Sequence, residues 1–167
     1  MLKILGGSYL NNAVIKDHVT IDSSKIQDSS VDEYTTIGPM SHLRNNTHVG
    51  KHCRIGNFVE FKNTNFGDGS KCAHLTYVGD SDVGKNVNFG CGVVTVNYDG
   101  KNKFRTTIKD GAFIGSNVNL IAPVTIGENA LLAAGSTITD DVEDGDMGIA
   151  RNRQSNKEGY GTQYKNK

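Results

Sequence analysis

The side chains best suited to proton transfer or metal binding near neutral pH are the imidazoles of five histidines. His42 and His48 stand six residues apart, and we expect His18 and His52 at solvated turns. Zinc sites need three or more converging ligands, and no such convergence is visible in this spacing, so we expect no metal. His74 differs in its context, because it stands within the mixed polar and aromatic segment KCAHLTYVGD.

A second group of reactive side chains lies at about residues 95–107. This segment reads VNYDGKNKFR and combines amide, phenol and cationic groups within ten residues. Its Asp-Gly pair is a turn signal. Loops on a rigid scaffold often carry binding and catalytic residues. We therefore expect an extruded loop with a functional role, in preference to a tolerated insertion.

The element that must position these side chains is a repeat of six residues. One aliphatic column comprises Ile108, Ile114, Leu120, Ile126, Leu132 and Ile138. A weaker column, four residues further on, comprises Ala112, Val118, Val124, Ala130, Ser136 and Val142. Such a period is typical of a parallel β-helix, in which three units form one triangular turn, and about 18 residues per turn predicts about seven turns from Ile15 to Val142. An amphipathic helix would need apolar residues at i, i+3, i+4 and i+7, which this column lacks.

Composition narrows the class of protein. The chain has 167 residues, 36% of them hydrophobic, and a formal net charge of zero, which gives no support for binding nucleic acid. No apolar run is long enough to cross a membrane, and no secretory signal is visible. Three cysteines without a CxxC pair indicate reduced thiols in a cytoplasmic protein.

The repeat also sets the expected domain limits. We expect an all-β helix over residues 1–142 and a C-terminal tail over residues 143–167. Acidic residues gather where the repeat ends, and the tail beyond is mostly basic. Charge runs of this kind are usually solvated. Arg151 stands apart from the rest of the tail because it lies at the junction with the last turn.

The segment from Gly38 to Arg151 resembles the C-terminal acetyltransferase domain of the bifunctional bacterial N-acetylglucosamine-1-phosphate uridyltransferase/glucosamine-1-phosphate acetyltransferase family. The stretches that carry the resemblance are GPMSHLR, GNFVEFKN, GSKCAHLTYVGD, VNFG, VNYDGKNKFRTTI, FIGSNVNLIAPVTIG and AAGSTIT. HLTYVGD and VNYDGKNK are more specific than the six-residue repeat, which many acyltransferases share. The resemblance implies a cytoplasmic homotrimer of left-handed parallel β-helices with sites between subunits. It also implies acetyl transfer from acetyl-CoA to the amine of glucosamine 1-phosphate.

The resemblance further implies a role for individual residues. His74 matches the general base, since an imidazole can take the proton that blocks an ammonium group from attacking a thioester. The residues that match sugar-phosphate contacts are Arg44, Lys62, Tyr77, Asn88 and Lys103. Those that match positions along the acetyl-CoA path are Cys91, Asn97, Tyr98, Ser116, Ala134 and Arg151.

The chain also departs from the family pattern. His42 stands where many members have arginine, so phosphate binding should depend more on Arg44. Cys91 stands where alanine is common. The glycine-rich nucleotide loop of the uridyltransferase domain is absent from these residues, so we expect acetyl transfer without uridylyl transfer and without the Mg²⁺ that domain uses.

Three alternative functions stay open at this point. The nearest is a hexapeptide acyltransferase with another acceptor. A trimeric, β-helical carbonic-anhydrase-like metalloenzyme is the second. The third is a non-catalytic β-helix, such as an ice-binding or scaffold protein, which the mixed and charged outward positions disfavour.

Overall fold

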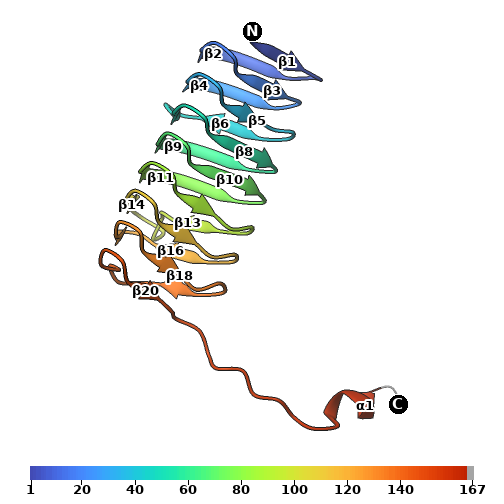
Figure 1. The fold of residues 1–167 in the computed structure, drawn as a ribbon, viewed down its shortest axis with the longest axis vertical. Helices are drawn as coiled ribbons and strands as arrows, with labels where there is room; N and C mark the ends of the chain where they lie inside the picture. The colour runs from blue at the N-terminus through green and yellow to red at the C-terminus, as the bar shows by residue number, and fades with distance from the viewer. Residues whose placement is uncertain (165–167) are drawn as a thin grey trace.

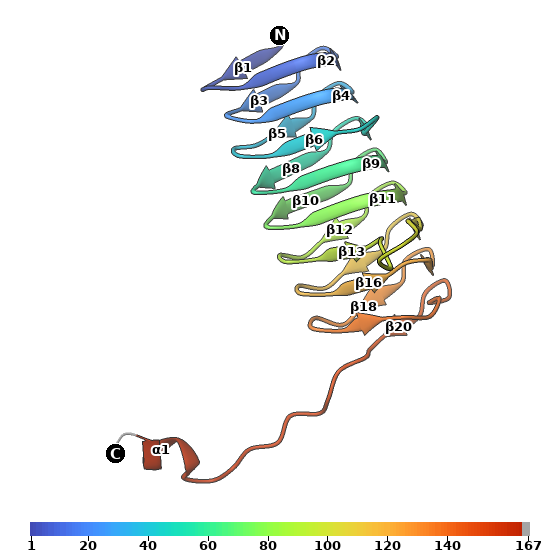
Figure 2. The ribbon, with the colours of Figure 1, turned by 180° about the vertical axis from the view of Figure 1, so that it is seen from behind.

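The fold is a stack of short parallel strands wound into a prism (Figure 1). The computed structural model describes residues 1–164, so the last three residues of the expected tail, 165–167, lie outside the described part. The N-terminus lies at one end of the stack, and the segment after β20 extends away from the other end to a short helix, α1 (Tyr160–Tyr164) (Figure 2). None of the helices in residues 1–164 has the length and apolar character needed to span a membrane.

One face of the prism is a nine-stranded parallel sheet, which corresponds to about nine turns. Its strands, in spatial order, are β1 (Lys3–Leu5), β3 (Thr20–Asp22), β5 (Thr36–Ile37), β8 (Arg54–Asn57), β10 (Lys71–His74), β12 (Asn88–Phe89), β15 (Phe113–Ile114), β18 (Leu131–Leu132) and β20 (Met147–Gly148). The sheet continues beyond Val142, where the repeat in the sequence ends, because β20 pairs with β18. The first turn likewise begins before Ile15, at β1 and β2.

The other two faces form one continuous eleven-stranded sheet. Its strands are β2 (Tyr9–Ile15), β4 (Lys25–Val31), β6 (His42–Arg44), β7 (His48–Val49), β9 (Glu60–Phe66), β11 (Tyr77–Val83), β13 (Val94–Val96), β14 (Thr106–Ile108), β16 (Asn119–Ile121), β17 (Val124–Ile126) and β19 (Thr137–Ile138). Each seven-residue strand turns the corner at its fourth residue, which has a positive φ: Asn12, Asp28, Asn63 and Asp80. Asn and Asp are the side chains that tolerate this left-handed conformation best.

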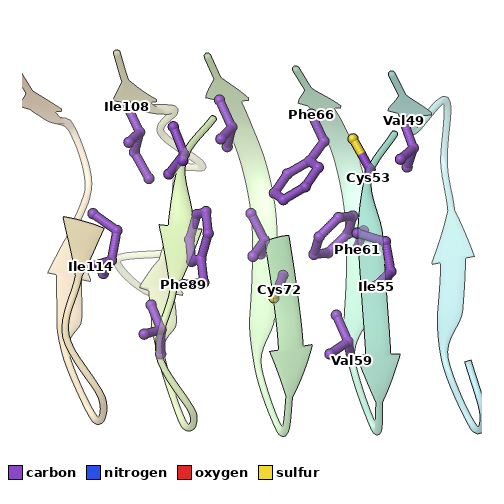
Figure 3. Close-up of a cluster of buried hydrophobic side chains, with 14 of the residues drawn as sticks. Val49, Cys53, Ile55, Val59, Phe61, Phe66, Cys72, Phe89, Ile108 and Ile114 are labelled. Carbon is purple, nitrogen blue, oxygen red and sulfur yellow. The ribbon is translucent and has the colours of Figure 1, made fainter. Parts of the chain in front are cut away.

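The core is a column of stacked side chains along the axis of the prism. Every residue of the first predicted column is buried, and so are all of the second column except Val142, which is partly buried. Figure 3 shows Phe61, Phe66 and Phe89 pointing into this interior together with Cys72 and the aliphatic residues. The prediction of a parallel β-helix with these inward columns is confirmed.

The turns are not all of one length, which explains the irregular places in the repeat. Paired residues lie 16 positions apart at Tyr9 and Lys25, and 18 apart at Phe113 and Leu131. A turn that is one residue shorter omits a corner residue and leaves the inward column in register. The six-residue period therefore slips along the sequence although the side chains stack without a break.

Candidate active site

His74 is the last residue of β10, at the corner that leads to β11. Its backbone carbonyl accepts a hydrogen bond from Thr76 Oγ1 at 2.7 Å, and Leu75 makes the turn with a φ of 44°. The side chain is exposed, and its imidazole makes no hydrogen bond within residues 1–164. The ring is therefore free to accept a proton from a group that approaches from solvent.

The same corner in the following turns carries predicted acetyl-CoA contacts. Cys72, Phe89, Ile114 and Leu132 are in register along the inward side of the nine-stranded sheet. His74, Cys91, Ser116 and Ala134 each follow one of these residues by two positions and so form a file along the prism axis. The backbone continues this order, since Asn117 N donates to Cys91 O and Gly135 N donates to Ser116 O, both at 2.8 Å.

Arg151 lies at the far end of this file. A methyl group placed on Gly135 would contact Arg151 Cδ at 3.8 Å, so the arginine side chain passes over the turn that follows Ala134. Adjacent parallel strands lie about 4.8 Å apart, so four successive turns give a path roughly 15 Å long from His74 to Ala134. The file, with Arg151 at its end, is long enough to support an extended chain.

The predicted phosphate contacts lie on the next face of the prism. Arg44 on β6 is in register with Lys62 on β9, and Lys62 is in register with Gly79 on β11. Arg44 Nη2 lies 2.7 Å from Glu60 Oε1, and both side chains are partly exposed. Tyr77 starts β11, and its hydroxyl group lies over Gly79, where any Cβ would collide with it. Tyr77 therefore borders the row that contains Lys62.

Lys62 and Lys103 meet at a hollow of about 360 Å³ on the corner beyond this face. The residues that line it are Asn45, Asn46, Lys62, Asn63, Asp80 and Lys103. Lys62 comes from β9, whereas Lys103 comes from the loop between β13 and β14 (Figure 1). Two ammonium groups against one carboxylate leave the hollow with a net positive charge, which suits an anionic group.

The extruded loop is held at both of its ends. At its start, the Asn97 amide donates a hydrogen bond to Asp80 Oδ2. At its end, Arg105 donates to both carboxylate oxygens of Asp82, at 2.8 and 2.7 Å, and to Ser81 O at 3.0 Å. The Arg105 guanidinium holds the pKa of Asp82 below its ordinary value. The loop is thus fixed to β11, although its tip, including Tyr98, is exposed.

Asp80 is the contact that the sequence reasoning missed. The residue is buried, and its carboxylate accepts hydrogen bonds from Lys62, Asn63 and Asn97. Burial raises the pKa of Asp80, but these three donors outweigh it and hold the pKa below the ordinary value. Lys62 and Asp80 lie one turn apart along the chain. Because residues one turn apart are neighbours on adjacent strands, the length of the repeat could have indicated that these two side chains meet.

On a single chain, the predicted site residues thus lie in separate places on the prism. His74, Cys91, Ser116, Ala134 and Arg151 follow one corner. Arg44, Lys62, Tyr77 and Lys103, with the loop residues Asn97 and Tyr98, lie on the neighbouring face and its far corner. Asn88 is on β12, in register with Lys71 and Phe113 of the nine-stranded sheet, so it lies on a different face from Lys62.

The other histidines lie apart from one another. His18 and His52 stack on either side of Tyr34, with ring centroids 4.6 and 5.0 Å from the tyrosine ring. His42 and His48 each contact polar side chains of adjacent strands. In the part of the chain that the structure describes, no three His, Cys, Asp or Glu side chains gather in a way that could hold a metal ion.

Comparison with known proteins shows which proteins this chain is similar to. Residues 105–140 match the family described as Bacterial transferase hexapeptide (six repeats). Bifunctional protein GlmU of Exiguobacterium sp. (strain ATCC BAA-1283 / AT1b) is 54% identical over 153 residues, which are 92% of this chain and 34% of that protein. The chain is homologous to part of GlmU. The GlmU of Shouchella clausii (strain KSM-K16) is 57% identical over 157 residues, which are 94% of this chain and 35% of that protein.

These relatives confirm the resemblance to a bifunctional bacterial protein that the motifs indicated. The chain spans about a third of the length of the GlmU relatives it matches. Two solved structures share the fold at low sequence identity. The polySia specific acetyltransferase NeuO has a TM-score of 0.58 and 16% identity, with 90% of this chain and 83% of that chain covered. The UDP-N-acetylglucosamine acyltransferase from Campylobacter jejuni has a TM-score of 0.53 and 14% identity, with 84% and 68% covered.

Proposed function

We propose that these 167 residues transfer acetyl from acetyl-CoA to the amine of glucosamine 1-phosphate, in the cytoplasmic route to UDP-N-acetylglucosamine. The observation that carries the proposal is the meeting of Lys62 and Lys103 at one hollow, in a chain more than half identical to GlmU relatives. Both lysines stand in the motifs that match the acetyltransferase region. Two cations at one site suit the dianionic phosphate of this acceptor.

The chemistry needs one base and two binding surfaces. His74 takes a proton from the ammonium group of the acceptor, and the freed lone pair attacks the thioester carbonyl carbon. A C–N bond forms and the C–S bond breaks. Of the two protons that the nitrogen loses on becoming an amide, one goes to the CoA thiolate and the other passes from His74 to solvent. Acetyl-CoA lies along the file of Cys91, Ser116 and Ala134, with Arg151 near a phosphate of CoA. The sugar phosphate lies toward Arg44, Lys62, Tyr77 and Lys103, with Asn88 supplied from the nine-stranded sheet.

The chain acts as a homotrimer in this proposal. His74 and the lysine hollow border opposite edges of one flat face, and Tyr77 to Asp80 spans three residues of β11, or roughly 10 Å. A flat face gives a small substrate only one wall, whereas binding sites are concave. A neighbouring copy packed against this face supplies the second wall and encloses the acceptor.

Dilution tests the trimer directly. We expect acetyl transfer per chain to fall as the protein is diluted into the range where light scattering shows monomers. The loss should be reversed when the protein is concentrated again, because the second wall of the site returns. Full activity in samples that contain only monomers would contradict the shared site.

Lys62→Met tests the phosphate contact. We expect the KM for glucosamine 1-phosphate to rise roughly 10- to 100-fold, since a hydrogen bond to a charged group contributes about 1.5–3 kcal/mol. The KM for acetyl-CoA should stay near the parent value. Lys101→Met is the matched control, because Lys101 is an exposed lysine of the extruded loop that does not line the hollow. Equal KM values for the two variants would show that Lys62 does not hold the acceptor.

A further inference from the structure

Asp80 occupies an unusual place in the candidate site. It is the fourth residue of β11 and turns the corner of the prism with a φ of 48°. Its side chain points into the hollow, between Lys62 on the preceding turn and the base of the extruded loop. Asp80 therefore stands where the sugar-phosphate face and the loop meet.

Its carboxylate is fully engaged by three donors. Lys62 Nζ lies 2.9 Å from Oδ2, the Asn97 amide donates to the same oxygen, and Asn63 Nδ2 donates to Oδ1 at 2.6 Å. The Lys62 and Asp80 side chains are only 12% and 6% exposed. A carboxylate buried to this degree is costly unless it is paired and hydrogen-bonded. The donors satisfy that need, and in return the carboxylate fixes the position of each donor.

We infer that Asp80 is a positioning residue that holds the Lys62 ammonium and the Asn97 amide in one fixed arrangement around the acceptor; this inference rests on the proposed function. Lys62 is a flexible side chain, and without an anchor its ammonium group would spread over many rotamers. Ordering it in advance removes that entropic cost from phosphate binding. The shared carboxylate also keeps the loop base at a set distance from Lys62, so Lys62 and Lys103 face the same hollow.

Asp80→Asn is the variant that isolates this role. Asn keeps the shape of the side chain and tolerates the left-handed corner, as Asn63 does on the preceding turn. One amide oxygen and one NH₂ group cannot accept bonds from three donors, and the charge that anchors Lys62 is lost. Asp28→Asn is the matched control, because Asp28 turns the same corner with a φ of 46°, bonds Asn12 at 2.8 Å and does not line the hollow.

The experiment is a double-mutant cycle with Lys62→Met, read out by calorimetric binding of glucosamine 1-phosphate and by its KM. We expect Asp80→Asn to weaken binding roughly tenfold or more in the parent, as for loss of a charged hydrogen bond. In the Lys62→Met background the loss should be clearly smaller than in the parent, because only the Asn97 amide and the loop base are left for Asp80 to position. A defect confined to folding would persist in both backgrounds.

The outcomes separate a failure of the inference from a failure of the proposed function. The inference alone is overturned if the parent turns over glucosamine 1-phosphate and the Asp80→Asn variant binds this acceptor as tightly as the Asp28→Asn variant does. An equal loss of affinity in both backgrounds also overturns the inference alone, since Asp80 would then act independently of Lys62. A folded parent with no turnover overturns the proposed function and the inference with it. If Asp80→Asn fails to fold, Asp80→Ser replaces it, because Ser23 already adopts a left-handed corner with a φ of 43°.

Discussion

We expect the replacement of His74 with alanine to lower the turnover number for acetyl transfer by roughly 10²–10⁴-fold, the usual contribution of a general base. The acceptor amine is an ammonium ion at neutral pH, and it cannot attack until a proton is removed. The exposed imidazole at the end of β10 borders both the file of predicted acetyl-CoA contacts and the face that carries Tyr77. Turnover is measured as thiol release at saturating concentrations of both substrates.

The melting temperature of His74→Ala should match that of the parent, because the side chain is exposed and makes no hydrogen bond within residues 1–164. His52→Ala is the control, since His52 is also exposed at a corner with a positive φ but lies on another part of the prism. We expect its turnover to stay within about twofold of the parent, since surface substitutions away from a site usually have small effects. Similar turnover in the His74 variant and the parent would remove His74 from the reaction.

Phe66→Ala should cost about 3–5 kcal/mol of stability, the range for truncating a buried aromatic side chain. The Phe66 ring is 1% exposed, and its centroid lies 4.9 Å from that of Phe61 and 5.9 Å from that of Phe89. Figure 3 shows these three rings side by side in the interior, with Phe61 and Phe66 both on β9 and Phe89 on β12. The backbone of a β-helix cannot collapse into the resulting cavity without breaking the ladders on either side.

Thermal and denaturant unfolding, followed by circular dichroism, measure this loss. Phe113→Ala serves as the control because Phe113 is 48% exposed on β15, and we expect it to change the melting temperature far less. Equal shifts for the two variants would mean that burial in the central column does not set the stability of the stack.

Much of the fold could be predicted because an aliphatic residue stands at every sixth position and points inward. Ile114 and Leu132 are six-residue column members, and the structure buries both completely. The number of turns and the ends of the stack were harder, because the strand pairs of β1 and of β20 use short segments without a clear aliphatic column. Hydrophobic periodicity indicates which side chains are buried. It does not indicate the strands at the ends of the stack, because these strands lack a clear aliphatic column.

The candidate site was predictable in part. The resemblance supplied its residues, and the register of the inward column explains why His74, Cys91 and Ser116 share one file. The carboxylate partners were not foreseen, since the pairing of Lys62 with Asp80 and of Arg105 with Asp82 joins residues a turn or more apart. Such contacts depend on which side chains face one another after winding, and a change of one residue in the length of a turn would separate them.

The decisive experiment for the proposed function is an assay of acetyl transfer by this chain itself. Purified protein is mixed with acetyl-CoA and glucosamine 1-phosphate, thiol release is followed, and the product is identified by mass and by the presence of an amide. We expect steady turnover, with N-acetylglucosamine 1-phosphate as the product and thiol release that depends on the acceptor. A folded trimer that releases no thiol with this acceptor, yet acetylates another amine or a hydroxyl group, would contradict it.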